Sequence, residues 1–269
     1  MPATIKLLMP KIAALIFLIF VSCNLKAQTW ELGATVGGSG YMGDLNPNNP
    51  VKVSGISASG FVARNFDGYL SLKLNYTFGI ISAADSNSSN QQFRDRNLSF
   101  TTTLNEIALI GEFNFMKYIP EAGKNKFTPF IYLGIASINY APTTIYQGAK
   151  VSLRDNKTEG QGQPYKPMAI SIPYGAGVKY NILGKWTLIG DIGYRNPNTD
   201  YLDDVSGNYP AKTSLKTPLA IALSDRSGEK NGFYIGSPGS QRGDLHPRDT
   251  YFFIQVGISY TFVTSKCYY

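Results

Sequence analysis

After its N-terminus, the chain has no long run of apolar residues. A helix that crosses a membrane needs about 18 or more of them in succession, and no such run occurs beyond the first 27 of the 269 residues. A protein that crosses a membrane with helices is therefore excluded.

The N-terminus itself has the layout of a secretory signal peptide. Lys6 and Lys11 precede the apolar stretch 12–21, and small residues follow. We expect cleavage after Ala27, which makes residues 1–27 the signal peptide. Cleavage before Cys23, as in a lipoprotein, is the alternative, but the residues that precede this cysteine match the lipoprotein pattern poorly.

Concentrated charge is also missing. The chain has 25 basic and 18 acidic residues. Loss of the signal peptide removes three lysines and no acid, so that 22 minus 18 leaves a net charge of +4. This mild excess comes without a basic helix or a stacking motif, so nucleic acid is not an expected partner.

What the chain has in quantity is tyrosine, glycine and alternation. It contains 18 tyrosines and 27 glycines, and apolar residues recur at every second position in eight segments, which indicates strands with one apolar face. The segments are 30–40, 53–63, 70–80, 106–115, 127–140, 170–180, 186–195 and 251–262. The fifth segment is apolar on both faces, so its register is left open. Residues 28–269 are expected to form a single domain.

The polarity of these strands favours a membrane over water. Large apolar residues occupy one face, whereas glycine, serine and charged residues occupy the other, and aromatic residues collect at the ends of the apolar face. These aromatic residues are Trp30, Tyr180, Trp186, Tyr194, Tyr260 and Phe262. A soluble barrel or sandwich is the alternative, but its core would have to be the polar face. We predict an all-β fold, an eight-stranded antiparallel transmembrane β-barrel.

The lengths of the connections predict the orientation of this barrel. Connections after the second, fourth and sixth strands are short (65–68, 118–126 and 181–185), whereas the others are mostly longer, and the last spans residues 201–250. In outer-membrane barrels the short turns lie in the periplasm. We therefore expect a protein of a Gram-negative outer membrane with periplasmic termini.

Charged residues on the inward face are expected to fill the lumen. The set contains four acids and three bases, and an eight-stranded barrel is only wide enough to hold side chains. Its members are Glu31, Lys73, Glu106, Glu112, Lys179, Asp191 and Arg195. We predict a paired network that plugs the barrel; a narrow ion path is the alternative.

Catalytic and metal-binding patterns are weak. The single histidine, His246, lies in the last long connection, where a lone histidine is usually solvated, and a hydrolase needs a base held beside its nucleophile. Asp200, Asp203 and Asp204 form an acidic group, but its spacing lacks the pattern of a calcium-binding loop. We expect solvated carboxylates, no enzymatic activity, no cofactor and no metal.

Cleavage after Ala27 would leave one cysteine, Cys267, just beyond the last strand. The periplasm is oxidising, and an unpaired cysteine in an exported protein suggests an intermolecular disulfide or a reactive thiol. An inert residue in the C-terminal tail is the alternative.

Three stretches of the chain carry a family resemblance. GGSGYMGDLNP at 37–47, DYLDDVSGNYP at 200–210, and DTYFFIQVGISYTF at 249–262 with the ending KCYY resemble the PorG-type outer-membrane barrels of the type IX secretion system. The resemblance implies a non-enzymatic component of protein export, and of gliding motility in some bacteria, which associates with a periplasmic ring of a lipoprotein and its partner, PorK and PorN.

Under this interpretation the periplasmic turns and tail are the contact surface. The candidate contact residues are Asn65, Phe66, Asp67, the stretch from Tyr118 to Lys126, and Cys267. A small stand-alone porin or a surface adhesin is the alternative function.

Overall fold

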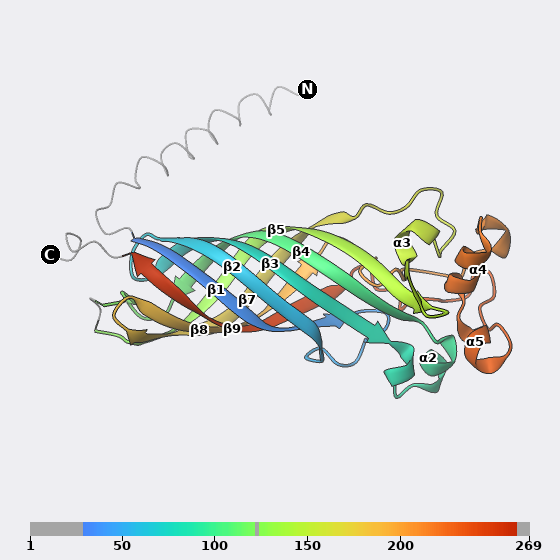
Figure 1. Ribbon diagram of the computed structural model, residues 1–269, viewed down its shortest axis with the longest axis horizontal. Coiled ribbons are helices and arrows are strands. Elements are labelled where there is room, and N and C mark those ends of the chain that lie inside the picture. The colour runs from blue at the N-terminus through green and yellow to red at the C-terminus, as the bar shows by residue number, and fades with distance from the viewer. Residues whose placement is uncertain (1–28, 122–123, 263–269) are drawn as a thin grey trace, which may run out of the picture.

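The protein is one closed antiparallel barrel (Figure 1) in a computed structural model that describes residues 29–121 and 124–262. Each long strand pairs with its neighbours in the chain, and β1 pairs with β9 to close the ring. The eight long strands are β1 (Thr29–Met42), β2 (Val53–Asn65), β3 (Leu70–Ala84), β4 (Ser99–Asn114), β5 (Phe127–Tyr146), β7 (Met168–Leu183), β8 (Trp186–Pro197) and β9 (Thr250–Phe262). The predicted eight-stranded barrel is confirmed. The proposed signal peptide and Cys267 lie outside the described residues.

The two ends of the barrel differ (Figure 1). At the turn end, β1 begins, β9 ends, and the connections β2–β3, β4–β5 and β7–β8 are short. At the loop end, the other connections form a cap with short helices and an added strand. These elements are η1 (Asp85–Asn87), α2 (Gln91–Arg96), β6 (Ala149–Ser152), α3 (Leu153–Asn156), η2 (Lys212–Ser214), α4 (Pro218–Ser224) and α5 (Ser227–Asn231). Within residues 29–121 and 124–262, no helix has the length and apolar character needed to cross a membrane.

The outer wall is apolar. Along β3, Leu70 and Leu74 are about half exposed, at 50% and 55%, whereas the intervening Ser71 and Asn75 are buried. The same alternation recurs around the barrel, so that leucine, isoleucine, valine and aromatic side chains cover its outside. Such a wall is the one that a lipid bilayer requires, with small or polar residues turned to the interior. The barrel therefore embeds in an outer-membrane bilayer.

Two strands differ from the pattern in the sequence. β4 begins at Ser99, well before the predicted segment at 106, and Phe100 and Leu104 point inward and are buried. The inner face of this part of β4 is apolar rather than polar. It lies at the loop end, where it packs against the cap instead of against the polar groups of the lumen. β5 also continues to Tyr146, where it pairs with β6.

The register of β5, left open by the sequence, follows from an aromatic layer inside the barrel. Phe130 and Tyr132 face the lumen and are buried, whereas Ile131 and Leu133 are exposed on the outer wall. Both faces are apolar because the inner face here carries rings instead of small polar residues.

One residue of the outer face is covered by protein. Phe252 alternates with the outward residues of β9, yet only 1% of its surface is exposed. The β1–β2 connection folds back over this part of the wall: the Tyr194 hydroxyl donates to the carbonyl of Pro50 at 3.2 Å, and the Tyr194 ring lies 5.5 Å from that of Phe252. The outward face of β9 is therefore covered at the loop end by chain rather than by lipid.

Glycine on the inner wall makes room for the aromatic layer. A Cβ added to Gly193 would lie 1.7 Å from the hydroxyl oxygen of Tyr132, whereas a Cβ added to Gly60 would meet nothing within 4 Å. We expect Gly193→Ala to lower the free energy of unfolding by about 1–3 kcal/mol through overpacking, and Gly60→Ala to leave it unchanged. Urea unfolding in phospholipid vesicles, followed by tryptophan fluorescence, measures both; equal midpoints would show that the layer can move aside.

Candidate functional site

The structure places the seven predicted lumen charges inside the barrel. Toward the turn end, the Glu112 carboxylate contacts Lys73 Nζ at 3.1 Å and also Lys179 Nζ. Glu112 and Lys179 are each 3% exposed. Lys179 Nζ also lies 5.1 Å from the ring centroid of Phe130. One carboxylate therefore joins two lysines next to the aromatic layer.

A second charged group lies closer to the loop end. Arg195 Nε is 3.5 Å from Glu106 Oε1, and the Tyr251 hydroxyl donates to Glu106 Oε2 at 2.6 Å. The Arg195 guanidinium also lies 4.5 Å from the ring centroid of Phe253. Both charged residues are buried.

The two remaining acids accept hydrogen bonds from neutral groups. Ser259 Oγ donates to Glu31 at 2.6 Å, and Asn65 Nδ2 donates to the same carboxylate at 3.2 Å. The Tyr132 hydroxyl donates to Asp191 at 3.3 Å. Charge pairing in the lumen therefore involves five of the seven predicted residues: Lys73, Glu106, Glu112, Lys179 and Arg195.

Side chains fill the lumen between these groups. A cavity of about 20 Å³ lies among residues that include Thr35, Asn75 and Gln255, and a volume of this size holds about one water molecule. The Gln255 amide accepts a hydrogen bond from the Thr35 hydroxyl and donates one to the Ser59 hydroxyl, and these two residues lie on different strands. This layer of the barrel interior is thus a packed polar core.

The β4–β5 connection closes the turn end. Tyr118 enters the barrel mouth, where its hydroxyl lies 2.7 Å from Thr187 Oγ1, and only 7% of the residue is exposed. Burial raises the pKa of its phenol to about 12. Tyr118 is therefore not available to a partner, contrary to our expectation.

The other candidate contact residues differ in accessibility. Asp67 is exposed, and its carboxylate accepts from the backbone N–H groups of Tyr69 and Leu70 at 2.7 and 2.8 Å. Lys126 is exposed, and Phe66 is half-buried. Asn65 turns inward to Glu31. The accessible part of the predicted surface therefore includes Asp67 and, within the stretch 118–126, Glu121, Lys124, Asn125 and Lys126.

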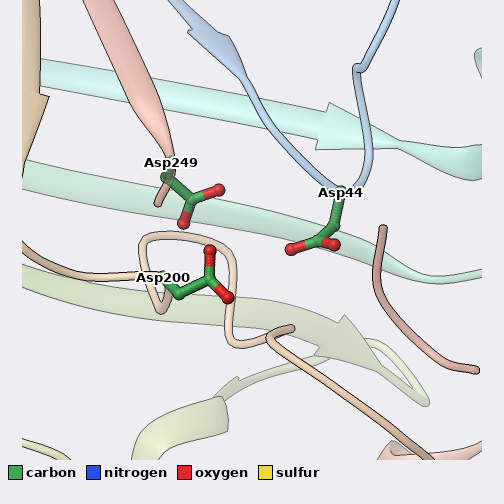
Figure 2. A group of neighbouring side chains, drawn as sticks. All are labelled: Asp44, Asp200 and Asp249. Carbon is green, nitrogen blue, oxygen red and sulfur yellow. The ribbon is translucent and has the colours of Figure 1, made fainter. Parts of the chain in front are cut away.

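At the loop end, three carboxylates from distant parts of the chain converge (Figure 2). Asp44 follows β1, Asp200 follows β8, and Asp249 precedes β9; each offers a carboxylate oxygen, and these oxygens all lie within 4.8 Å of one another. Asp44 and Asp249 are 2% and 1% exposed. Burial raises the pKa of the Asp200 carboxyl to about 6 and raises that of Asp249 well above its usual range.

Asp203 and Asp204, expected to be solvated, are buried as well. Tyr41 Oη lies 2.5 Å from Asp203 Oδ2, and the Tyr165 hydroxyl donates to Asp204 at 2.7 Å. The expectation was wrong because the β8–β9 connection folds onto the barrel mouth and carries these side chains inward. Burial raises the pKa of the Asp204 carboxyl to about 6.

Two buried arginines hold the loops around these acids. Arg96 Nη2 donates to Asp85 at 2.7 Å and to the backbone carbonyl of Asp44 at 3.0 Å. Arg242 Nη1 donates to Glu159 and to the backbone carbonyl of Asp204, both at 2.9 Å. Each guanidinium is therefore already paired with a carboxylate outside the cluster of Figure 2.

The sequence did not group Asp44 and Asp249 with Asp200. No motif joins them, because each follows or precedes a different strand and only barrel closure brings them together. Asp249 lies three residues after His246 in the sequence, and the His246 side chain is 77% exposed and lies 3.1 Å from Asp244. The one available signal was position, since all three aspartates lie in connections of the loop end.

Known proteins were compared with this chain by sequence and by structure, and solved outer-membrane proteins and one family model match it. No curated protein sequence matches it. Neisserial surface protein A is similar in fold, with 11% identity and a TM-score of 0.42 over 87% of this chain and 97% of that one. A major outer membrane protein of Thermus thermophilus has 12% identity and a TM-score of 0.43, over 88% of this chain and 100% of that one.

A third solved structure and one family model also match this chain. Ail of Yersinia pestis, solved in complex with the heparin analogue sucrose octasulfate, has 10% identity and a TM-score of 0.37 over 87% of this chain and 97% of that one. The family model described as "Domain of unknown function (DUF6089)" matches residues 10–223. Because this match spans most of the sequence, the chain belongs to the DUF6089 family.

Proposed function

We propose that this protein is a non-enzymatic outer-membrane component of the type IX secretion system, in which the barrel anchors a periplasmic ring of PorK-like and PorN-like proteins. The filled lumen is the observation that supports a binding role most directly. Glu112 and Lys179 form an ion pair inside the barrel, and Tyr118 closes the barrel mouth at the turn end. A protein of this form acts through the surfaces at its two ends.

The layout of the connections supports a periplasmic contact at the turn end. The short connections, the start of β1 and the end of β9 lie together there. Short turns of outer-membrane barrels face the periplasm. Asp67 and Lys126 are exposed at this end. Cys267 follows β9 in the sequence and lies outside the described residues, and the proposal counts it among the contact residues.

Affinity purification of the tagged full chain from detergent-solubilised outer membranes tests the proposal. We expect to recover a periplasmic lipoprotein and its partner, and to lose them when Asp67→Lys and Lys126→Glu are combined. Lys212→Glu, at the loop end, is the matched control and should retain both. Non-reducing gels with Cys267→Ser show whether a disulfide contributes.

Two results would contradict the proposal. Recovery of the barrel alone under mild conditions, with export intact in a deletion strain, would exclude a role in secretion. Steady conductance of the purified protein in planar bilayers would favour a small porin instead.

A further inference from the structure

The three carboxylates of Asp44, Asp200 and Asp249 form a ligand set for a hard cation. Their oxygens lie within 4.8 Å of one another, and calcium binds oxygen ligands at 2.3–2.6 Å. Oxygens on opposite sides of one calcium ion are therefore separated by about 4.6–5.2 Å. The spacing of the three carboxylates therefore suits a single ion bound between them.

A second observation comes from the hydrogen bonds of Asp44. Its Oδ1 accepts from the backbone N–H of Asp244, whereas its Oδ2 is buried and has no hydrogen-bond partner. Figure 2 shows the Asp44 carboxylate turned toward Asp200 and Asp249. A buried carboxylate oxygen without a partner costs free energy, because it has lost its hydration and gained nothing in return.

The neighbouring groups do not neutralise the cluster. Tyr41 Oη lies 2.5 Å from Asp203 Oδ2 and 3.0 Å from Asp249 Oδ1, but a phenol has one proton and can donate to only one of them. The guanidinium of Arg96 is paired with Asp85, at 2.7 Å. The like charges of these acids therefore repel one another in a buried place.

We propose that Asp44, Asp200 and Asp249 bind a calcium ion at the loop end of the barrel. The ion supplies the positive charge that the buried carboxylates lack, and it gives Asp44 Oδ2 a partner. It joins the β1–β2 connection to both ends of the β8–β9 connection, and so stabilises the cap. In the proposed orientation this site faces the cell exterior, where calcium sites bind with a Kd of about 10⁻⁴–10⁻³ M.

Terbium luminescence tests the site in the full chain, refolded in detergent after removal of metals with EDTA. Tb³⁺ takes calcium sites and is sensitised by nearby tyrosine, here Tyr41. We expect a saturable signal that Ca²⁺ displaces. Asp44→Asn should weaken Tb³⁺ binding by at least about tenfold, since loss of even an outer-shell partner costs about 10–100-fold. Asp155→Asn, which removes an exposed loop carboxylate of equal charge, should not.

A second measurement uses the unaltered protein and does not depend on the folding of a variant. Calcium should slow trypsin cleavage within residues 199–249 by several-fold relative to EDTA, while the barrel strands stay resistant under both conditions. The proposal is overturned by the absence of saturable Tb³⁺ luminescence in the unaltered chain, by equal affinities of the unaltered chain and Asp44→Asn, or by cleavage rates that calcium does not change.

Discussion

Replacing Glu112 by glutamine is expected to lower the free energy of unfolding of the barrel by about 3–5 kcal/mol, the usual cost of breaking a buried ion pair on one side. Glu112 is 3% exposed and contacts both Lys73 and Lys179. A glutamine keeps the shape of the side chain but leaves two ammonium groups without their counter-ion inside the barrel. Urea unfolding in phospholipid vesicles measures the loss.

The matched control is Glu121→Gln. Glu121 lies 3.9 Å from Lys185 at the turn end, and their side chains are 51% and 31% exposed, so this pair should contribute little to stability. A combined variant, Glu112→Leu with Lys73→Met and Lys179→Met, separates charge from packing, because replacing a whole buried charge network with apolar residues is often neutral. If the Glu112→Gln variant were as stable as the unaltered chain, this result would show that water reaches these lysines.

Much of this lumen could be predicted from the sequence because a membrane wall imposes strict alternation. The inward direction of each charged side chain is predicted because its neighbours along the strand point outward. Lys73, for example, lies between Leu72 and Leu74, both exposed on the outer wall. A shift of one residue would place the charge in lipid, so the register of such a strand is strongly specified. Alternation failed at Phe130 and Tyr132, where the inner face is itself aromatic.

The cap at the loop end could not be predicted in the same way, because its order depends on contacts between distant segments. Local signals do mark its helices: Thr217 accepts from the backbone N–H of Ala220 as the N-cap of α4, and Pro218 follows at the first helical position. Nothing local shows that Asp44 and Asp249 meet. Their meeting requires that β1 and β9 be neighbours, which is a property of the closed barrel.

Arg96→Ala should separate the stability of this cap from that of the barrel. Arg96 is 5% exposed; its guanidinium donates to both oxygens of Asp85 and to the carbonyls of Arg242 and Asp44. These hydrogen bonds link three connections of the loop end, β1–β2, β3–β4 and β8–β9. Without it, Asp85 is a buried carboxylate with no cation, which costs about 3–5 kcal/mol.

We expect this cost to appear in the cap alone, since the strands keep their own hydrogen bonds. Hydrogen exchange should therefore become faster in residues 85–98 and 199–249 while the eight long strands of the barrel stay protected, and the urea midpoint of the barrel should not change. Arg96→Lys keeps the charge but not the planar pair of donors to Asp85, so it should restore only part of the protection. Arg94→Ala, on the same helix but outside the buried pair with Asp85, is the matched control. Faster exchange in the strands themselves would contradict this division, because it would mean that the cap and the barrel unfold as one unit.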